Sequence, residues 1–313
     1  MLKFFSQRLL AIIPVLLVVA IIVFLILRLT PGDPAAVIAG NNATNEDIDR
    51  IRITLGLDKP VLAQFFIWIG NVLQGDLGYS FYLNKPVTEL LARRIEPTLS
   101  LAAGTMFIAI GIAVPLGTIA AWRMGGWLDR ILSAFSVLGF SVPVFVIGYI
   151  LIYIFAIRLE WLPVQGYSRL EKGFGPWITQ ILLPCITLSF IYVALIARVT
   201  RAAVSETLTE DYIRTARAKG LPERIVLLRH ALANAAVPIA TVIGLGVALL
   251  IGGVVVTETV YAIPGLGSLT VDAVLNRDFP VIQGVVLLFS LAYVLINLLV
   301  DVSYLVFDPR IRY

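Results

Sequence analysis

Long apolar runs, separated by polar segments, are the dominant pattern along this chain. Six runs are long enough to cross a bilayer, which takes roughly 20 apolar residues. They cover residues 9–27, 99–121, 131–157, 177–197, 237–257 and 281–305. The pattern predicts an all-α membrane protein with six transmembrane helices. The first run is longer than the apolar core of a secretory signal, and no convincing cleavage site follows it, so we expect a retained anchor.

The composition agrees with a membrane protein and excludes several kinds of site. Hydrophobic residues make up 59% of the 313 and charged residues 14%, against about 25% charged in soluble domains. Single Cys185 and single His230 exclude an internal disulfide, a multi-cysteine metal site and a paired-histidine site. The sequence contains no GxxxxGK[ST], HExxH or GxSxG motif. We expect no metal, no cofactor and no catalytic residue in this chain.

The interiors of the apolar runs hold essentially no ionisable side chains. Glu258 and Asp301 lie near the ends of the fifth and sixth runs. Carriers driven by an ion gradient usually need such groups at membrane depth. An ion-coupled secondary carrier is therefore a distant alternative, and energy for transport would have to come from outside the spans.

Lysine and arginine are concentrated in alternate loops, which predicts the orientation of the chain. Cytoplasmic loops carry an excess of these residues. They precede the first run, flank the loop after the second, crowd the loop after the fourth and close the chain (Lys3, Arg8, Arg123, Arg130, Arg198, Arg201, Arg214, Arg217, Lys219, Arg224, Arg229, Arg310 and Arg312). We therefore expect both termini to be cytoplasmic, with residues 29–95 outside.

Two short helices are predicted in the polar segment after the first run. Residues 44–47 indicate a helix start that leads into Ile51 and Leu55, and residues 64–73 are amphipathic. We expect them to pack at the outer membrane surface, as a vestibule or only as a cap.

The third run contains polar and helix-breaking residues that are candidates for lining a translocation path. These are Ser136, Ser141 and Pro143. Proline kinks a helix, and serine offers a hydroxyl at membrane depth. Plain packing within a helix bundle is the alternative explanation.

The loop after the fourth run has the pattern helix, glycine turn, helix. Val204, Leu208, Tyr212 or Ile213, and Ala216 recur at helical spacing, which predicts one helix over residues 203–219. Gly220 is a suitable stop, and Pro222 suits the first turn of a second helix. From composition alone the loop is either a lipid-facing basic segment or a docking helix for a soluble partner.

Residues 210–221, EDYIRTARAKGL, resemble the signature cytoplasmic loop of the permease subunits of ABC importers. They are most similar to the B-type permease of the dipeptide/oligopeptide/nickel importers. Ala216 and Gly220 match the general importer pattern, whereas Arg214 and Thr215 stand where it has Glu and Ala. The resemblance extends over nearly the whole chain, through residues 29–34, 55–60, 75–78, 258–261, 264–267, 277–281 and 308–312.

The resemblance implies a type I ABC-importer permease in the bacterial inner membrane. Its partners would be a homologous second permease subunit, two ATPase subunits that bind ATP and Mg, and an extracytoplasmic solute-binding protein. The implied coupling residues, which would dock on the ATPase, are Tyr212, Arg214, Thr215, Ala216, Arg217, Ala218, Lys219 and Gly220. Di- or oligopeptides are the implied substrates, with glutathione, a nickel chelate or an opine-like solute as alternatives.

The expected division of the chain follows from these assignments. Residues 1–28 form the anchor helix and 29–95 the extracytoplasmic segment. Residues 96–306 form a five-helix core that includes the coupling loop at 198–236. The tail is 307–313 and lies in the cytoplasm.

Overall fold

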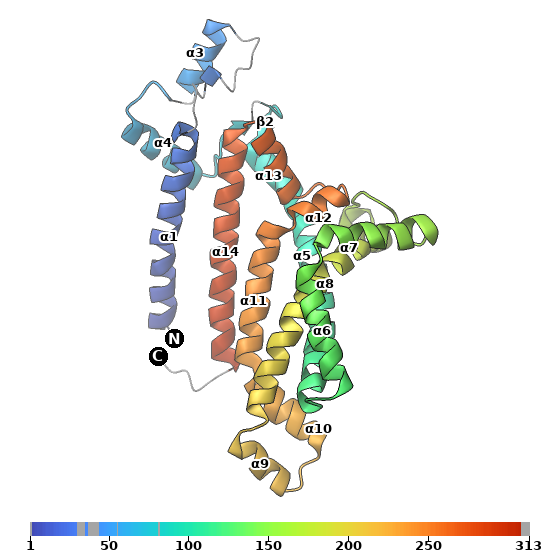
Figure 1. Ribbon diagram of the computed structural model, residues 1–313. Helices are drawn as coiled ribbons and strands as arrows, with labels where there is room; N and C mark the ends of the chain where they lie inside the picture. The colour runs from blue at the N-terminus through green and yellow to red at the C-terminus, as the bar shows by residue number, and fades with distance from the viewer. Residues whose placement is uncertain (1, 30–34, 37–43, 55, 81, 308–313) are drawn as a thin grey trace. The chain divides into compact units, whose positions relative to one another are not determined.

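The computed structural model describes residues 2–29, 35–36, 44–54, 56–80 and 82–307. Within these residues the regular structure is helical apart from one pair of two-residue β-strands, so the all-α prediction is confirmed (Figure 1). The predicted motifs at 30–34 and 308–312 and the tail after residue 307 lie outside the described residues.

The helices fall into a group before the short β pair and a longer group after it. Before the strands lie α1 (Leu2–Leu29), α3 (Asn45–Thr54) and α4 (Val61–Leu73). The strands are β1 (Tyr79–Ser80) and β2 (Lys85–Pro86). After them come α5 (Val87–Trp122), α6 (Trp127–Ser141), α7 (Val144–Leu151), η1 (Ile152–Arg158), η2 (Leu170–Lys172), α8 (Phe174–Thr207), α9 (Asp211–Ala218), α10 (Glu223–Ile225), η3 (Val226–Leu232), α11 (Ala236–Gly253), α12 (Val255–Val260), α13 (Leu266–Leu275) and α14 (Phe279–Phe307).

Three helices are long and apolar enough to span a membrane: α5, α8 and the part of α14 over Phe279–Tyr304. Two further spans are formed if each of two bent pairs counts as one. The 127–141 and 144–158 segments meet at 101°, and the 223–232 and 236–252 segments at 60°. Residues 10–26 of α1 form a shorter apolar helix. The described residues thus support three to five spans, and a sixth stays a prediction.

The third apolar run is sharply bent rather than one straight helix. α6 ends at Ser141, and Val142 is extended at φ −91° and ψ 123°. Pro143 then caps the start of α7, with φ −59° and ψ 135°. Proline has no N–H to continue the hydrogen-bond ladder, and it pushes the residue before it out of the helical region. The break therefore falls where the sequence predicts a kink.

The chain divides into two compact units. The first unit comprises residues 1–96 and 264–294. The second comprises residues 97–263 and 295–313.

The first unit has a core made by the start of α5, α13 and α14. Val87, Leu269 and Val281 are fully buried in it. The two helices predicted after the first apolar run are present as α3 and α4, and their place on the outer side stays a prediction. Asp278 precedes α14 and accepts a hydrogen bond from the Ser80 hydroxyl. Burial raises the pKa of the Asp278 carboxyl above its ordinary value, and the Ser80 bond opposes that rise.

The second unit is built around α8, which buries residues along most of its length. Small residues let neighbouring helices approach it closely. A Cβ added to Gly139 of α6 would lie 2.8 Å from the Cβ of Ala194, and one added to Gly117 of α5 would lie 2.7 Å from the carbonyl oxygen of Ala197. Both glycines therefore serve helix packing.

Candidate functional site

The loop after α8 is not the single helix that the sequence predicts over residues 203–219. α8 ends at Thr207, and α9 begins at Asp211 after a turn. Thr209 donates its hydroxyl to the carbonyl oxygen of Glu206, and Glu210 is extended at φ −67° and ψ 147°. Threonine side chains that bond to nearby carbonyls compete with helical continuation. The break lets α9 take its own direction at the end of α8 (Figure 1).

One face of α9 is held by a small apolar core. Ile213 and Ala216 are buried, and they belong to a cluster with Val204 at the end of α8 and with Val226 and Ala231 of η3. Of the two residues that the periodicity offered, the core takes Ile213, and Tyr212 is 42% exposed. Because α9 has only eight residues, it depends on this contact rather than on its own propensity.

Gly220 ends α9, as predicted, and two backbone hydrogen bonds close this end of the helix. Its φ is +76°, a left-handed value that glycine adopts without strain. The Gly220 N–H donates to the carbonyl oxygen of Arg217 at 2.9 Å, and the Leu221 N–H donates to that of Ala216 at 3.3 Å. This pair of bonds is a Schellman motif. Pro222 then caps α10, one residue before the predicted helix position.

Charges on the loop are arranged along α9 and across its turn. Asp211 lies in the first turn and Arg217 in the last, which suits the helix dipole. The Arg217 Nε lies 2.7 Å from Glu223 Oε1 and its Nη2 lies 3.3 Å from Oε2, so this pair is bidentate. Arg214 and Asp211 form a longer, exposed pair at 3.3 Å.

The proposed coupling residues divide by exposure. Ala216 lies on the buried face of α9 and packs in the apolar core there. The other seven lie on the exposed side of α9 or in its turn: Tyr212, Arg214, Thr215, Arg217, Ala218, Lys219 and Gly220. A Cβ on Gly220 would meet no atom within 4 Å. The loop therefore presents a charged surface with open space at the glycine turn.

A polar groove of about 310 Å³ lies beside this surface, between the end of α8, the start of α9 and the start of α11. Glu206 and Glu210 give it two carboxylates, and Tyr212, Asn234 and Pro238 complete much of its wall. Tyr212 thus belongs to both the groove and the exposed side of α9.

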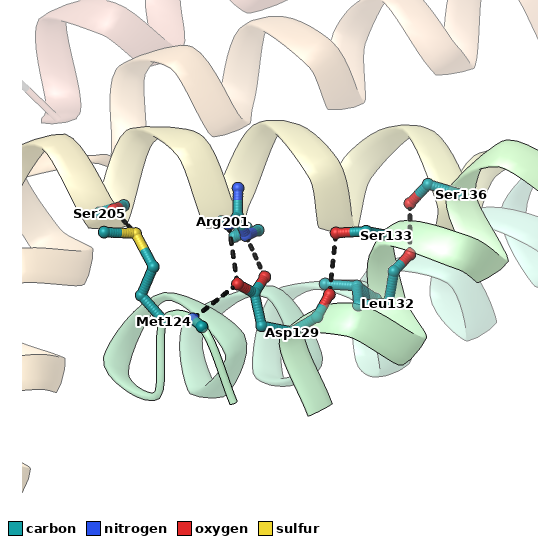
Figure 2. Close-up of polar contacts among 8 residues, drawn as sticks. Met124, Asp129, Leu132, Ser133, Ser136, Arg201 and Ser205 are labelled. Carbon is teal, nitrogen blue, oxygen red and sulfur yellow. Dashed lines mark hydrogen bonds and ion pairs between the residues drawn. The ribbon is translucent and has the colours of Figure 1, made fainter. Parts of the chain in front are cut away.

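An ion pair ties α6 to α8 six residues before α8 ends, and no sequence pattern predicted it. Arg201 of α8 donates from Nε and Nη2 to the carboxylate of Asp129 in the first turn of α6, the Nη2 bond being 2.9 Å (Figure 2). Asp129 also accepts the Gly125 N–H at 2.9 Å. Its side chain is 8% exposed and that of Arg201 31%. An acidic residue at a helix start was visible in the sequence, but its partner is 72 residues away.

The three candidate path residues lie in different settings. Ser136 is buried and donates to the carbonyl oxygens of Leu132 at 2.8 Å and Ala194 at 3.4 Å. Ser141 is exposed and donates to the carbonyl oxygen of Val137. Pro143 caps the start of α7. Thus Ser136 joins α6 to α8, whereas Ser141 and Pro143 mark the bend.

Comparison with known families identifies the chain's class. The family described as "Binding-protein-dependent transport system inner membrane component" matches residues 113–313. The corresponding N-terminal family, "Binding-prot-dependent transport system membrane comp, N-term", matches residues 1–102. The break between the two matches falls within α5.

Full-length relatives and a solved structure agree with these matches. A "probable peptide ABC transporter permease protein" of Sinorhizobium fredii is 54% identical over 307 residues, 98% of each chain. A glutathione transport system permease protein of Pectobacterium atrosepticum is 46% identical over 313 residues, all of each chain. A chain of the MetNI methionine ABC transporter in an inward-facing conformation shares the fold with a TM-score of 0.59, at 19% identity over 70% of this chain and 96% of its own.

Membership of this family also assigns a location and a general kind of partner. An ABC-importer permease works with an ATPase and a substrate-binding protein, and is itself a transport subunit rather than an enzyme. The chain therefore belongs to the family of binding-protein-dependent transport system inner membrane components, as a multi-pass ABC-importer permease subunit.

Proposed function

We propose that this chain forms one half of a translocation pathway for peptides and couples it to ATP hydrolysis through α9. A homologous permease subunit would supply the other half. Two ATPase subunits would dock on the loop surface and bind ATP and Mg, and a solute-binding protein would deliver the substrate. No cofactor in this chain is part of the proposal.

The observation that carries the proposal is the way α9 is presented. Ile213 anchors the helix to the core, the Gly220 turn ends it abruptly, and the side chains between them that face outward are mainly basic. A lipid-facing loop needs charge but no fixed helix end. A docking helix needs a rigid shape, because only a rigid element transmits a displacement.

The contacts around the loop provide a route by which a displacement of α9 would reach the bent helices. Ile213 packs with Val204 of α8, so α9 and the end of α8 would move together. Arg201, one turn earlier than Val204, holds Asp129 of α6. α6 leads to the break at Pro143. Motion of the ATPase subunits would thereby change the α6–α7 bend, where Ser136, Ser141 and Pro143 are the proposed path residues.

The proposed orientation places both termini and the loop in the cytoplasm, with the 29–95 segment outside and the five-helix core at 96–306. The uneven distribution of lysine and arginine supports it. Cys185 is the chain's single cysteine and is buried, so cysteines introduced at positions 58 and 214 can be labelled separately. In intact cells labelled from the outside, position 58 should react and position 214 should not. Reaction of position 214 instead would contradict the proposed orientation.

Gly220→Trp tests the docking surface, with Gly220→Asn as its control. Asparagine tolerates the left-handed backbone and is small, whereas tryptophan adds bulk where a docked partner would lie. We expect Gly220→Asn to assemble and transport, and Gly220→Trp to reach the membrane but lose ATPase subunits on gentle-detergent purification. A Gly220→Trp variant that assembles fully and transports at the unmodified rate would contradict the docking role.

Peptides are the proposed substrates because several relatives are named as peptide permeases. The relative at 54% identity is named as a peptide permease, and those at 46% and 44% are glutathione permeases. Glutathione, itself a tripeptide, is therefore the second candidate. Uptake of labelled dipeptides, tetrapeptides and glutathione by cells with and without the chain separates these, and failure of all three leaves the nickel-chelate and opine-like alternatives.

A further inference from the structure

A second cavity, of about 510 Å³, lies wholly within the first unit and has no part in the proposed coupling. It is enclosed by the end of α1, by α4, by the turn before β1 and by the start of α14. Its wall is mixed. Aromatic and aliphatic side chains such as Phe24 and Trp68 line it together with Arg28, Lys59 and Asp76.

Arg28 is held rigidly at the edge of this cavity. Its Nε donates to the Gln64 side-chain oxygen at 3.1 Å, and its Nη2 donates to the same oxygen. Its Nη1 donates to the carbonyl oxygen of Phe24 at 2.9 Å, and the guanidinium lies 3.4 Å from the centre of the Phe24 ring. Gln64, 8% exposed, is fixed in turn by donating to the carbonyl oxygens of Leu57 and Lys59. A buried amide therefore positions this arginine.

The contacts between described residues use three of the five N–H donors of Arg28. None of them is to a carboxylate: the partners are a neutral amide and a backbone carbonyl. The positive charge is thus oriented without being neutralised in this part of the chain. Lys59 adds a second positive charge to the lining, and Asp76 adds one negative charge while its Oδ1 accepts the Gly78 N–H. Among the described residues, the lining therefore carries a net charge of +1 (two cations less one anion).

The surroundings of Arg28 are those of a membrane interface. It follows directly on the apolar run of α1, where Val18, Ile22 and Leu25 are exposed by 55%, 55% and 36%. Arginine at the end of such a run, with aromatic side chains at the same level, is typical of the headgroup region. Trp68 lies 5.7 Å from Phe24 between ring centres and supplies the aromatic side chain.

We propose that this cavity binds the phosphodiester group of a phospholipid, with its acyl chains along the exposed apolar face of α1. The phosphate would accept hydrogen bonds from Arg28 and a charge contact from Lys59. Planar guanidinium groups match phosphate oxygens geometrically, and a negatively charged headgroup matches the lining's net charge. The bound lipid would fix the end of α1 against α4.

The test compares two lipids that differ in the phosphate. The full-length chain, purified in gentle detergent and delipidated, is titrated with phosphatidylglycerol and with diacylglycerol of the same acyl chains, and bound lipid is counted by native mass spectrometry. We expect phosphatidylglycerol to bind and diacylglycerol not to compete. Inorganic phosphate is the third probe, and displacement of the lipid by millimolar phosphate would point to a free anion as ligand and overturn the lipid assignment.

Three variants locate the site. Arg28→Gln removes the charge and is expected to weaken phosphatidylglycerol binding roughly five- to tenfold, in line with about 1 kcal/mol per basic residue near a lipid surface. Lys59→Gln, at an exposed position outside the Arg28–Gln64 contact, should weaken it roughly two- to fivefold without disturbing the fold. Arg52→Gln, an exposed arginine of α3 paired with Asp49 and absent from the lining, is the control.

The variants also set the condition for rejection. If both cavity variants bind phosphatidylglycerol like the control, the proposal is wrong. If Arg28→Gln alone loses binding and its thermal stability falls as well, the arginine is only a structural clamp and the lipid assignment fails. The readout is lipid binding rather than uptake, so failure of the coupling proposal leaves this test unaffected.

Discussion

Two arginines on one short stretch of chain have opposite environments. Arg201 of α8 points inward and holds Asp129, whose side chain is 8% exposed. Thirteen residues later, Arg214 lies on the exposed side of α9, with its side chain 75% exposed and Asp211 beside it. Sequence composition treats both as basic loop residues. The difference shows that one basic stretch can contain both a largely buried ion pair that joins two helices and an exposed charged surface.

The two arginine–aspartate pairs also differ in how much stability the chain would lose without them. Removing one partner of a largely buried pair leaves a charge that water cannot fully solvate. Removing a side chain from an exposed pair changes little, because such pairs contribute at most about 1 kcal/mol. Substitutions can therefore tell inward from outward positions.

The largest effect on stability is expected where α9 meets the core. Ile213→Ala removes a fully buried side chain and leaves a cavity, which costs about 2–4 kcal/mol. Leu228→Ala in η3, at a position that is 48% exposed, is the matched control and should cost less than half as much. Thermal unfolding of the purified chain measures both. Equal losses of unfolding free energy in the two variants would mean that the small apolar core does not anchor α9.

The next effect concerns the inward arginine. Asp129→Ala leaves Arg201 without its carboxylate and is expected to cost about 2 kcal/mol, reduced from the fully buried value because Arg201 is 31% exposed. Asp211→Ala, which removes the partner of Arg214, should cost under about 0.5 kcal/mol. Adding Arg201→Ala to Asp129→Ala should recover part of the loss, and a double-mutant cycle without coupling energy would show that the pair contributes nothing.

A smaller effect is expected at Gly220, in the turn that ends α9. Gly220→Ala keeps the side chain minimal but forces it into the left-handed region, at a cost of about 1 kcal/mol. Gly220→Asn should cost less, because asparagine adopts that region more readily. Chemical or thermal unfolding ranks the two variants, and an alanine variant as stable as the glycine parent would contradict the φ of +76°.

The smallest effect on stability, and a large one on transport, is expected for the outward arginine. Arg214→Glu should change the unfolding free energy by under about 0.5 kcal/mol because the side chain is exposed. It replaces a positive charge with a negative one on the proposed docking surface, so transport per ATP hydrolysed should fall. The measurement is that ratio in proteoliposomes of the assembled transporter, with Arg224→Glu as a control outside α9. Unchanged coupling would mean that no partner recognises the charge of α9.

Much of the local structure could be predicted because its causes are local. The start of α3, the presence of α4, the stop at Gly220 and the break beside Pro143 all follow from residues within a few positions, although α4 begins three residues before the predicted segment. Family membership could also be predicted, because the motifs and their order along the chain are read from the sequence alone.

Other features depend on residues far apart in the chain and were not predictable from one sequence. Arg201 finds Asp129 across 72 positions, and Gln64 finds Arg28 across 36. The sequence does not predict the turn at 208–210, because the apolar spacing across it still fits one helix. Tertiary contacts bury Ile213 and leave Tyr212 exposed. The choice of face for α9 was therefore made by the packing of η3 rather than by periodicity.

The Gly220 turn has a consequence for how such transporters diversify. Its two closing bonds join backbone atoms only, so the end of α9 keeps its shape whatever side chains stand at positions 214, 215, 218 and 219. Related importers in one cell would need permeases that each recruit their own ATPase. If the ATPase subunits dock on α9 as proposed, one glycine would fix the shape common to every pairing, and the exposed positions before it would be free to differ and keep the pairings apart.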